Sequence, residues 1–339
     1  MKKIALILGI TGQDGSYLAE FLMKKKYHVH GIKRRTSTPN TTRIDHIFDS
    51  INFDNKKLIM HHGDLSDAGS LNRIINEINP DEIYNLAAQS HVKISFQIPE
   101  YTSDVNAMGP LRLLEIIRHY KKKRIKFYQA SSSEMFGKSK PPQNEKTLFQ
   151  PRSVYAISKV FAYHSVIHYR EAYNLHCCNG ILFNHESPRR GVNFVTKKIV
   201  QGLTRIKNGK QKILVLGNLY SRRDWGHAKD YVESMWQILQ QKKPDDYVVA
   251  TRTSHSVKDF INISAKKIGI KLIWKNKGLK EVGIDKVKNK TIIMVNKKYF
   301  RETEVDNLIG DYSKAKRLLK WKPKYSFNAL VDDMIKNEK

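Results

Sequence analysis

The sequence predicts an α/β protein built on a doubly wound parallel sheet with a smaller second lobe, and three observations lead to that fold class. In the first half of the chain, short apolar segments typical of buried strands alternate with longer segments of helical periodicity. This alternation produces a parallel sheet with helices on both faces. A glycine-rich turn directly follows the first expected strand. Hydrophobic residues make up 40% of the 339 residues and recur along the whole chain, which is enough for a sizeable core.

The expected elements of the first half follow one another in strand–helix order. Apolar runs predict strands at residues 3–8, 28–33, 57–62, 82–85, 125–130 and 176–182. Amphipathic segments between them predict helices at residues 16–25, 70–79, about 102–120 and 152–173. Repeated units of this kind indicate a sheet of the Rossmann type.

The second half is less regular and denser in lysine. Its patterns predict helices at residues 194–208, 230–241 and 257–268 and strands at residues 212–216 and 246–250. We expect residues 1–180 to form the Rossmann-type domain, with about 225–255 returning to it. Residues 181–224 and 256–339 are expected to form a smaller C-terminal α/β lobe. Ligands of open α/β sheets bind beyond the carboxyl ends of the strands, so this lobe should supply the substrate contacts there.

The chain carries a large positive charge, because 61 Lys and Arg stand against 32 Asp and Glu and give a formal net charge of +29. The bases are spread over the whole length, and no zinc-finger spacing, RNP-like motif or basic leucine zipper is visible. We expect no nucleic-acid partner and interpret the charge as a lysine-rich surface, whose field would also attract an anionic substrate. A basic nucleic-acid-binding protein with a vestigial nucleotide fold is the alternative, and it predicts salt-sensitive binding to polyanions.

Cysteine usage and hydropathy favour a reducing compartment. The two cysteines, Cys177 and Cys178, are neighbours in an expected strand and point to opposite faces, so they form no disulfide. Two cysteines also cannot build the usual thiolate-rich zinc site. No apolar run approaches the ~20 residues that cross a bilayer, and the apolar start of the chain ends at once in the glycine-rich turn. We expect a cytoplasmic protein without a membrane partner or a metal.

The glycine-rich turn reads Gly9-Ile10-Thr11-Gly12-Gln13-Asp14-Gly15, a G-x-x-G-x-x-G spacing between an expected strand and an expected helix. Residues without a Cβ allow a tight backbone close to a pyrophosphate, and the following helix N-terminus offers it free N–H groups. The turn therefore predicts a dinucleotide site, although an ordinary strand–helix turn could show the same spacing. The contacts would come from Gly9, Thr11, Gly12, Gln13, Asp14 and Gly15.

The end of the second expected strand discriminates between dinucleotides. NAD-binding folds place an acid about 20 residues further on, where it holds the ribose 2′-hydroxyl. Here the chain continues with Arg34 and Arg35. Forked arginine donors could grip a 2′-phosphate, which favours NADP as the cofactor. Alternatively, both arginines are solvated loop residues.

Two further strand ends lie at the same expected rim. Asp64 and Leu65 follow the strand at 57–62, and Asp64 could accept a hydrogen bond from an adenine amino group. The strand at 82–85 is followed by small residues that would let the backbone approach a cofactor. These further candidates are Leu86, Ala87, Ala88 and Ser90, with Ser90 also a candidate for substrate. Simple turn chemistry would explain either segment as well.

Tyr155 and Lys159 stand four residues apart on an expected helix, which places them on one face. Tyrosine has an ordinary pKa near ~10 and is a poor base at neutral pH. A neighbouring ammonium and the positive charge of a nicotinamide would favour the phenolate. The pair therefore fits proton removal from a hydroxyl, although a surface Tyr–Lys pair is a common alternative.

A hydroxyl and a carboxylate follow the strand at 125–130. The segment from Gln129 to Gly137 contains Ser132 and Glu134. The hydroxyl could bind the substrate hydroxyl that is oxidised, and the carboxylate could act as a general base. A capping serine and an exposed loop acid are the alternatives. Together with Tyr155 and Lys159, these groups indicate an active site beside the nucleotide turn.

These features resemble the extended short-chain dehydrogenase/reductase family, which carries such a glycine turn and a Tyr-x-x-x-Lys pair. Within it, several stretches are similar to the GDP-mannose 4,6-dehydratase family, namely Gly9–Ala19, Tyr128–Glu134, Pro151–Lys159, Asn179–Gly191, Arg222–Tyr231 and Tyr299–Val305. The stretches that begin at Asn184 and Arg223 are characteristic of that family. The resemblance extends from the first strand to about Pro323.

The resemblance implies an internal redox dehydration of GDP-mannose to GDP-4-dehydro-6-deoxy-mannose. Tyr155, as phenolate, would take the proton of the sugar C4 hydroxyl while hydride passes from C4 to NADP+. Glu134 would remove the acidified C5 proton, the C6 hydroxyl would leave as water, and the hydride would return to C6. Lys159 would hold the nicotinamide ribose and lower the pKa of Tyr155. Ser132 stands where the family usually has threonine.

The resemblance also implies contacts outside the catalytic motif. Cofactor contacts are implied for Tyr101, His185 and Arg190, and nucleotide-sugar contacts for Asn184, Arg223, Arg301 and Glu304, beside Ser132, Glu134 and Tyr155. Forked arginines suit a diphosphate, although surface salt bridges are the alternative for each. A homotetramer, or at least a dimer, is implied as well, with the loop 34–43 reaching toward a neighbouring subunit. The residues themselves indicate only a long, basic loop that is not expected to pack against its own core.

Two alternatives keep the fold but change the substrate or the reaction. One retains the chemistry on another GDP-sugar, such as a GDP-manno-heptose. The other is a nucleotide-sugar epimerase or a simple oxidoreductase. Glu134 discriminates against it, because 4-epimerases of this superfamily lack a carboxylate there and need no C5 base.

Overall fold

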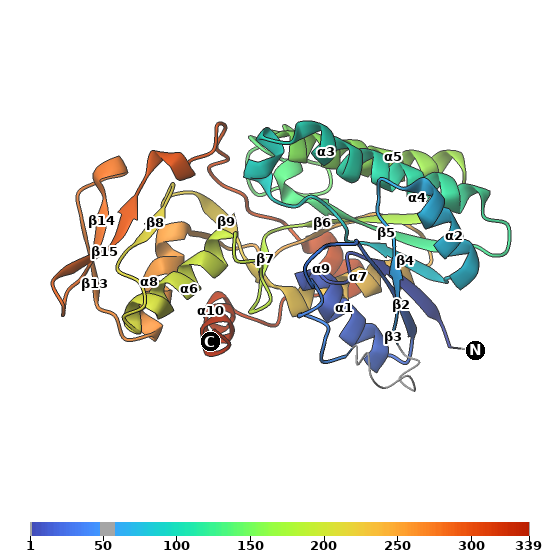
Figure 1. The fold of residues 1–339 in the computed structure, drawn as a ribbon. Coiled ribbons are helices and arrows are strands. Elements are labelled where there is room, and N and C mark those ends of the chain that lie inside the picture. The colour runs from blue at the N-terminus through green and yellow to red at the C-terminus, as the bar shows by residue number, and fades with distance from the viewer. Residues whose placement is uncertain (1, 48–57, 339) are drawn as a thin grey trace.

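The computed structural model describes residues 2–47 and 58–338, and it confirms the doubly wound α/β fold (Figure 1). Seven parallel strands form the main sheet in the order β11-β6-β5-β4-β1-β2-β3. Their bounds are β1 Ile4–Leu8, β2 His28–Lys33, β3 Leu58–His62, β4 Glu82–Asn85, β5 Lys126–Ser132, β6 His176–Leu182 and β11 Asp246–Val249. The strand order reverses between β1 and β4, the point at which such sheets bind ligands beyond their carboxyl ends.

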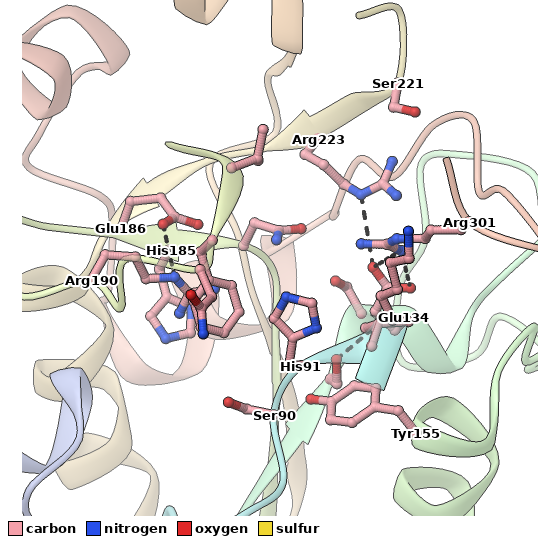
Figure 2. Close-up of a pocket in the computed structure, with 18 of the residues that line it drawn as sticks. Ser90, His91, Glu134, Tyr155, His185, Glu186, Arg190, Ser221, Arg223 and Arg301 are labelled. Carbon is pink, nitrogen blue, oxygen red and sulfur yellow. Dashed lines mark hydrogen bonds and ion pairs between the residues drawn. The ribbon is translucent and has the colours of Figure 1, made fainter. Parts of the chain in front are cut away.

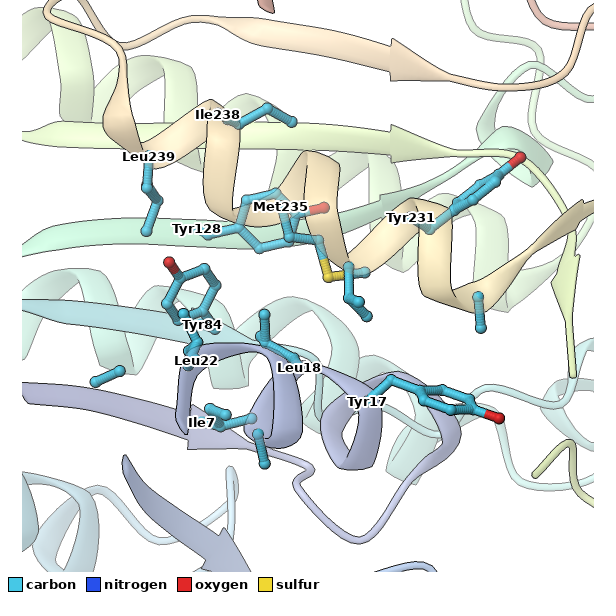
Figure 3. Packing of buried hydrophobic residues seen from close by; sticks show 14 of the residues in the cluster. Ile7, Tyr17, Leu18, Leu22, Tyr84, Tyr128, Tyr231, Met235, Ile238 and Leu239 are labelled. Carbon is cyan, nitrogen blue, oxygen red and sulfur yellow. The ribbon is translucent and has the colours of Figure 1, made fainter. Parts of the chain in front are cut away.

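Helices cover both faces of this sheet. The helices α1 (Gln13–Lys24), α7 (Ala228–Gln240) and α9 (Ser313–Leu319) lie on one face, and α2 (Ala68–Ile78), α4 (Gly109–His119) and α5 (Val154–Ala172) on the other. Neighbouring strand residues point to opposite faces, so Ile7 packs in one cluster with Leu18 and Met235 (Figure 3), while Leu6 packs in the other with Ile74. The sheet is therefore buried on both faces, and ligands can approach it at the carboxyl ends of its strands.

A second body, on the left of Figure 1, forms the smaller lobe. Its sheet has the order β13-β14-β15-β8, with β8 Leu214–Leu216, β13 Leu272–Lys275, β14 Val282–Asp285 and β15 Lys290–Val295. The helices α6 (Val195–Lys207), α8 (Val257–Lys267) and α10 (Phe327–Lys336) share one apolar cluster with it. Two short strand pairs run between the bodies: β7 (His185–Glu186) with β10 (Gly226–His227), and β9 (Arg222–Asp224) with β12 (Ser254–Ser256). The short helical turns are η1 Val92–Phe96, η3 Ser133–Met135, η4 Gly278–Lys280 and η5 Lys297–Tyr299.

The single helix expected at about 102–120 is wrong in detail. The chain there forms α3 (Pro99–Ser103), a π-helical turn η2 (Asp104–Met108) and then α4. Pro110 has no N–H to continue the regular ladder, and a wider turn accommodates the interruption. Gly109 also lets this turn approach the rim, because a Cβ on it would lie 2.8 Å from the Cβ of Leu65.

The C-terminal part crosses between the bodies more often than the sequence indicates. The segment β11, which lies within the expected returning stretch 225–255, joins the edge of the main sheet. Residues 312–321, assigned by the sequence to the lobe, pack with the main sheet instead, where Ala315, Leu319 and Trp321 are buried beside α7. The indole N–H of Trp321 donates to the carbonyl of Asp230 at 2.9 Å. No helix within 2–47 and 58–338 has the length and apolar character of a membrane span.

Candidate active site

Two adjoining cavities lie beyond the carboxyl ends of the main sheet. The turn cavity, of about 470 Å³, is bounded by the glycine turn and by the ends of β2, β3 and β4. The central cavity, of about 960 Å³, continues from it between the main sheet and the lobe. Both are lined by Asp14, Leu86, Ala88, Ser90, Arg190 and Phe194, so the two cavities adjoin at these residues.

The glycines allow close packing of the turn against the sheet. Gly9 has a φ of +78°, and a Cβ on it would lie 2.8 Å from the backbone nitrogen of Ala87. A Cβ on Gly15 would lie 2.3 Å from the carbonyl oxygen of Gly9. Gly12 caps α1 without a side-chain hydrogen bond, so the first N–H groups of the helix have no side-chain acceptor there. A helix N-terminus of this kind attracts an anion such as a phosphate.

The turn cavity contains almost every residue that the sequence predicts for the cofactor. Its lining includes Gly9, Thr11, Gly12, Gln13, Asp14, Gly15, Arg34, Asp64, Leu65, Leu86, Ala87, Ala88, Ser90, Tyr101 and Arg190. Arg34 donates to the hydroxyl of Tyr101 at the open side. Arg35 is the exception among the predicted site residues, because it lines neither cavity and donates to the carbonyl of Thr36.

Arg43 also lines the turn cavity, and sequence reasoning missed it as a site residue. Its Nε donates to the carbonyl of Arg189 at 2.7 Å and its Nη1 to the carbonyl of Thr11 at 3.3 Å. The neighbouring Ile44 is fully buried in the core. The expectation that the 34–43 loop stays off its own core is therefore wrong at its far end. The only signal in the sequence was a third arginine in that loop.

A partly buried ion pair lies where the two cavities meet. The Nε2 of His185 lies 2.7 Å from Asp14 Oδ2, and its Nδ1 lies 2.7 Å from the carbonyl of Phe183. Burial opposes charge on both groups, but their mutual attraction and hydrogen bond outweigh it, raising the pKa of His185 and lowering that of Asp14. The amide of Gln13 donates to the carbonyl of His185 at 3.1 Å and ties the turn to β7.

Tyr155 and Lys159 enter the central cavity from the start of α5. Ser153 caps that helix by accepting from the N–H of Ala156 at 3.1 Å, which fixes where the first turn begins. Both side chains are buried. The ammonium of Lys159 donates to the carbonyl of Ala130 at 2.8 Å and lies 6.0 Å from the centre of the Tyr155 ring.

Burial dominates the proton affinities of this pair. It raises the pKa of Tyr155 to about 12, with the Ser132 hydroxyl hydrogen bond acting in the opposite direction. It lowers the pKa of Lys159 to about 8. The ammonium of Lys159 is directed at Ala130, and the largest cause of the Tyr155 pKa shift is burial.

Glu134 lies above Tyr155 and faces two arginines (Figure 2). Its carboxylate oxygens are 3.3 and 3.4 Å from Arg301 Nη1, and one of them is 3.8 Å from Arg223 Nε. Burial opposes ionisation, but the charges of Arg301 and then Arg223 outweigh it and lower the pKa of Glu134. The backbone N–H of Glu134 donates to Ser132 Oγ at 3.2 Å and holds this hydroxyl at the start of η3.

The remaining predicted substrate residues also line the central cavity. This set is Ser90, Asn184, Arg223, Arg301 and Glu304. Glu304 accepts from the N–H of Arg301 at 3.0 Å and from Ser221 Oγ at 3.2 Å. The Oδ1 of Asn184 is buried without a hydrogen-bond partner in the described part of the chain, so it is available to a ligand.

Two more cavity residues were missed by sequence reasoning. His91 follows Ser90 directly, and its ring lies 5.5 Å from that of Phe194. Burial lowers the pKa of His91. The carboxylate oxygen Oε2 of Glu186 lies 2.9 Å from Arg190 Nε. Arg190, which the sequence predicts to contact the cofactor, therefore already has an acidic partner. The position of His91 after a strand end could have indicated it, whereas nothing in the spacing indicated the Glu186 pair.

Sequence comparison relates this chain to nucleotide-sugar enzymes. A family model described as GDP-mannose 4,6 dehydratase matches residues 6–334. A relative named GDP-mannose 4,6 dehydratase from Drosophila melanogaster is 55% identical over 98% of this chain and 85% of the relative. GDP-mannose 4,6 dehydratase 1 from Arabidopsis thaliana is 56% identical over 98% of this chain and 89% of the relative.

Solved structures of more distant proteins share the fold. A dTDP-glucose 4,6-dehydratase from Bacillus anthracis in complex with NAD matches with a TM-score of 0.79 at 21% identity, over 99% of this chain and 96% of that one. A UDP-glucuronic acid 4-epimerase from Bacillus cereus, in complex with UDP-glucuronic acid and NAD, matches with a TM-score of 0.80 at 21% identity, over 98% of both chains.

Proposed function

The chain belongs to the GDP-mannose 4,6-dehydratase family of hydro-lyases, and we propose that it uses NADP to convert GDP-mannose to GDP-4-dehydro-6-deoxy-mannose. One observation carries the proposal. Ser132, Glu134, Tyr155 and Lys159 line one cavity, and that cavity adjoins the one formed by the glycine turn. Proton removal from a hydroxyl and proton removal from a carbon can therefore occur on the same sugar ring.

The turn cavity fits a dinucleotide with a 2′-phosphate. The uncapped start of α1 suits a pyrophosphate, and the absence of a Cβ at Gly9 lets the turn pack against the backbone of Ala87 at the floor of this site. Arg34 and Arg43 line the same cavity, and a forked guanidinium suits a 2′-phosphate. The position of these two arginines supports NADP rather than NAD as the cofactor.

The first chemical step belongs to Tyr155 and Ser132. Tyr155 would remove the proton of the C4 hydroxyl, and the Ser132 hydroxyl would hold the C4 oxygen in place. A bound oxidised nicotinamide would supply the redox chemistry, taking hydride from C4 and returning it at C6. Lys159 would hold the ribose hydroxyls. Because burial raises the pKa of Tyr155 to about 12, this step needs added positive charge beside the phenol.

The elimination belongs to Glu134. A 4-ketone makes the neighbouring C5 proton acidic, and the buried carboxylate of Glu134 would accept it. Loss of the C6 hydroxyl as water then follows, and the same carboxyl group can protonate the leaving oxygen. Reduction at C6 and protonation at C5 complete the product, and the proton that Tyr155 took from the C4 hydroxyl balances the one gained at C5.

The substrate itself would span the central cavity. Arg223 and Arg301 suit the diphosphate, Glu304 a sugar or ribose hydroxyl, and the unpaired oxygen of Asn184 a donor on the ligand. Arg223 is held ready by the carbonyl of Val305, to which it donates at 2.7 Å.

We also propose a homo-oligomer, on the basis of an exposed apolar face. Ile157 and Phe161, one turn apart on α5, are 56% and 44% exposed. Met108, at the end of the neighbouring turn η2, is 41% exposed. Apolar side chains grouped in this way favour burial against a second copy of the chain. The cytoplasmic location stays a prediction.

One incubation tests the proposed reaction. Purified protein is mixed with catalytic NADP+ and GDP-mannose that carries deuterium at C4. The expected result is a 4-keto product with deuterium at C6 and no net NADPH. Net NADPH would indicate a simple dehydrogenase, and deuterium retained at C4 or lost to solvent would contradict the internal transfer. Turnover of a GDP-manno-heptose but not of GDP-mannose would change the substrate and keep the chemistry.

A further inference from the structure

The base of the proposed elimination is held by an arginine that the substrate also needs. Arg301 Nη1 lies 3.3 and 3.4 Å from the two carboxylate oxygens of Glu134. Arg301 comes from the loop after η5, whereas Glu134 follows β5 of the main sheet, so this ion pair joins the two bodies across the central cavity (Figure 2). Within the described residues, Arg301 and Arg223 are the cations paired with Glu134.

The two arginines differ in how firmly they are held. Arg223 is 6% exposed, and its Nη1 donates to the carbonyls of Val305 at 2.7 Å and Arg222 at 2.9 Å. The Arg301 side chain is 28% exposed, and Glu134 is the partner of its guanidinium. The anchor of Arg301 is its backbone N–H, which donates to Glu304 at 3.0 Å. The guanidinium of Arg301 can therefore change partners without breaking other contacts, and that of Arg223 cannot.

The geometry of a nucleotide sugar brings a competing anion to the same place. In a hexopyranose only the ring oxygen separates C5 from C1, which carries the diphosphate. A sugar that presents its C5 proton to Glu134 therefore brings two phosphate charges near Arg301. A diphosphate offers more charge and a bidentate geometry that a guanidinium prefers.

We propose that Arg301 passes from Glu134 to the diphosphate when the nucleotide sugar binds, and that this exchange frees the carboxylate to accept the C5 proton. The inference rests on the proposed function and deepens it. Recognition of the nucleotide end of the substrate thereby activates the base at the sugar end. A sugar without a diphosphate leaves Glu134 paired and a weak base.

The charges around Glu134 determine whether the exchange takes up or releases a proton. The groups that face it are Arg301, Arg223, Tyr155 and, next to the arginines, Glu304 and His91. Burial raises the pKa of Glu134, whereas Arg301 and Arg223 lower it, and Arg301 has the larger effect of the two. Departure of Arg301 leaves burial less opposed, so the carboxylate gains proton affinity. Binding must then take up a proton.

The experiment measures that proton without turnover. Tyr155→Phe stops the oxidation, and GDP-mannose is bound to this variant, saturated with NADP+, in a calorimeter. Each titration is repeated in buffers of different ionisation enthalpy between about pH 5 and 7, which gives the number of protons taken up. A rise of one pKa unit corresponds to about half a proton at the pH midway between the two values. Tyr155→Phe/Glu134→Gln is the matched control, and it removes only the proposed acceptor.

Each outcome decides the matter. Proton uptake that disappears with Glu134→Gln supports the exchange. Binding without uptake, or uptake that persists in the double variant and so belongs to another group such as His91, overturns it and leaves the proposed reaction intact. Failure of GDP-mannose to bind the folded variant overturns the proposed function as well. Tyr155→Phe/Arg301→Gln is a second test. This variant should bind GDP-mannose more weakly and take up no proton.

Discussion

The ammonium of Lys159 donates to the carbonyl oxygen of Ala130 at 2.8 Å, so the cation of the Tyr-x-x-x-Lys pair is bound to β5 and not to the phenol. Burial lowers the pKa of Lys159 to about 8 and raises the pKa of Tyr155 to about 12. The protein alone therefore keeps Tyr155 as a neutral phenol at neutral pH. Proton removal from the sugar requires both the phenol oxygen and a positive charge brought by the ligands.

Tyr155→Phe should abolish the oxidation of C4. The ring packs as before, but the group that accepts the hydroxyl proton is gone, so we expect turnover to fall by about 100-fold or more. Absorbance of reduced nicotinamide after mixing with GDP-mannose measures the step directly. Tyr173→Phe, at the C-terminal end of α5, is the control and should leave the signal unchanged. A normal rate of nicotinamide reduction in Tyr155→Phe would exclude this residue as the base.

Glu134→Gln should separate oxidation from elimination. An amide keeps the size of the side chain but accepts no proton from C5, so reduced nicotinamide should form and persist while dehydration falls by about 100-fold or more. Rapid-mixing absorbance and product analysis follow the two steps. Glu302→Gln changes an exposed acid close to Arg301 and should have little effect. Dehydration at an undiminished rate in Glu134→Gln would show that another group takes the C5 proton.

The parts of the fold that local pattern specifies could be predicted from the sequence. The strand at 176–182 and the turn from Gly9 to Gly15 depend on runs of adjacent residues, and Tyr155 and Lys159 share a face because of helical spacing. Pro110 breaks the regular helix through its missing N–H, a signal that was present and outweighed by the amphipathic pattern.

Contacts between distant segments could not be predicted in this way. Glu134 and Arg301 are 167 positions apart, and no periodicity relates them. Arg43 reaches the carbonyl of Arg189 because a loop folds back over the turn, which depends on packing of Ile44 and not on the spacing of bases. The return of Trp321 to the main sheet likewise follows from a tertiary contact, its bond to Asp230.

Arg34 and Arg35 test the choice of cofactor with a built-in control. Arg34 lines the turn cavity and Arg35 does not. Loss of one charge-assisted contact to a 2′-phosphate should weaken NADP binding in Arg34→Ala by about ten-fold, with little change for NAD. Arg35→Ala should leave both affinities unchanged. Fluorescence titration of the two cofactors measures this, and equal loss of NADP and NAD affinity in Arg34→Ala would contradict a 2′-phosphate contact.

The histidine pair of β2 and β3 should make the fold sensitive to acid. His30 Nδ1 lies 2.9 Å from His61 Nε2, and the rings stack with centroids 5.2 Å apart. Burial, then the neighbouring His61 and His28, lower the pKa of His30 to about 4. The unfolded chain binds this proton near its ordinary pKa of about 6.5. Stability is therefore lost as the pH falls from about 6.5 toward 4, because the unfolded state binds more protons there.

His30→Gln should reduce that loss. The ring is half-buried, so solvent screening limits the effect to about 1 kcal/mol between about pH 7 and 5. Urea unfolding at the two pH values measures the difference in unfolding free energy for the wild type and the variant. His119→Gln, an exposed histidine at the end of α4, is the control and should retain the wild-type dependence. If His30→Gln lost as much stability on acidification as the wild type, proton uptake at this pair would not account for the acid sensitivity.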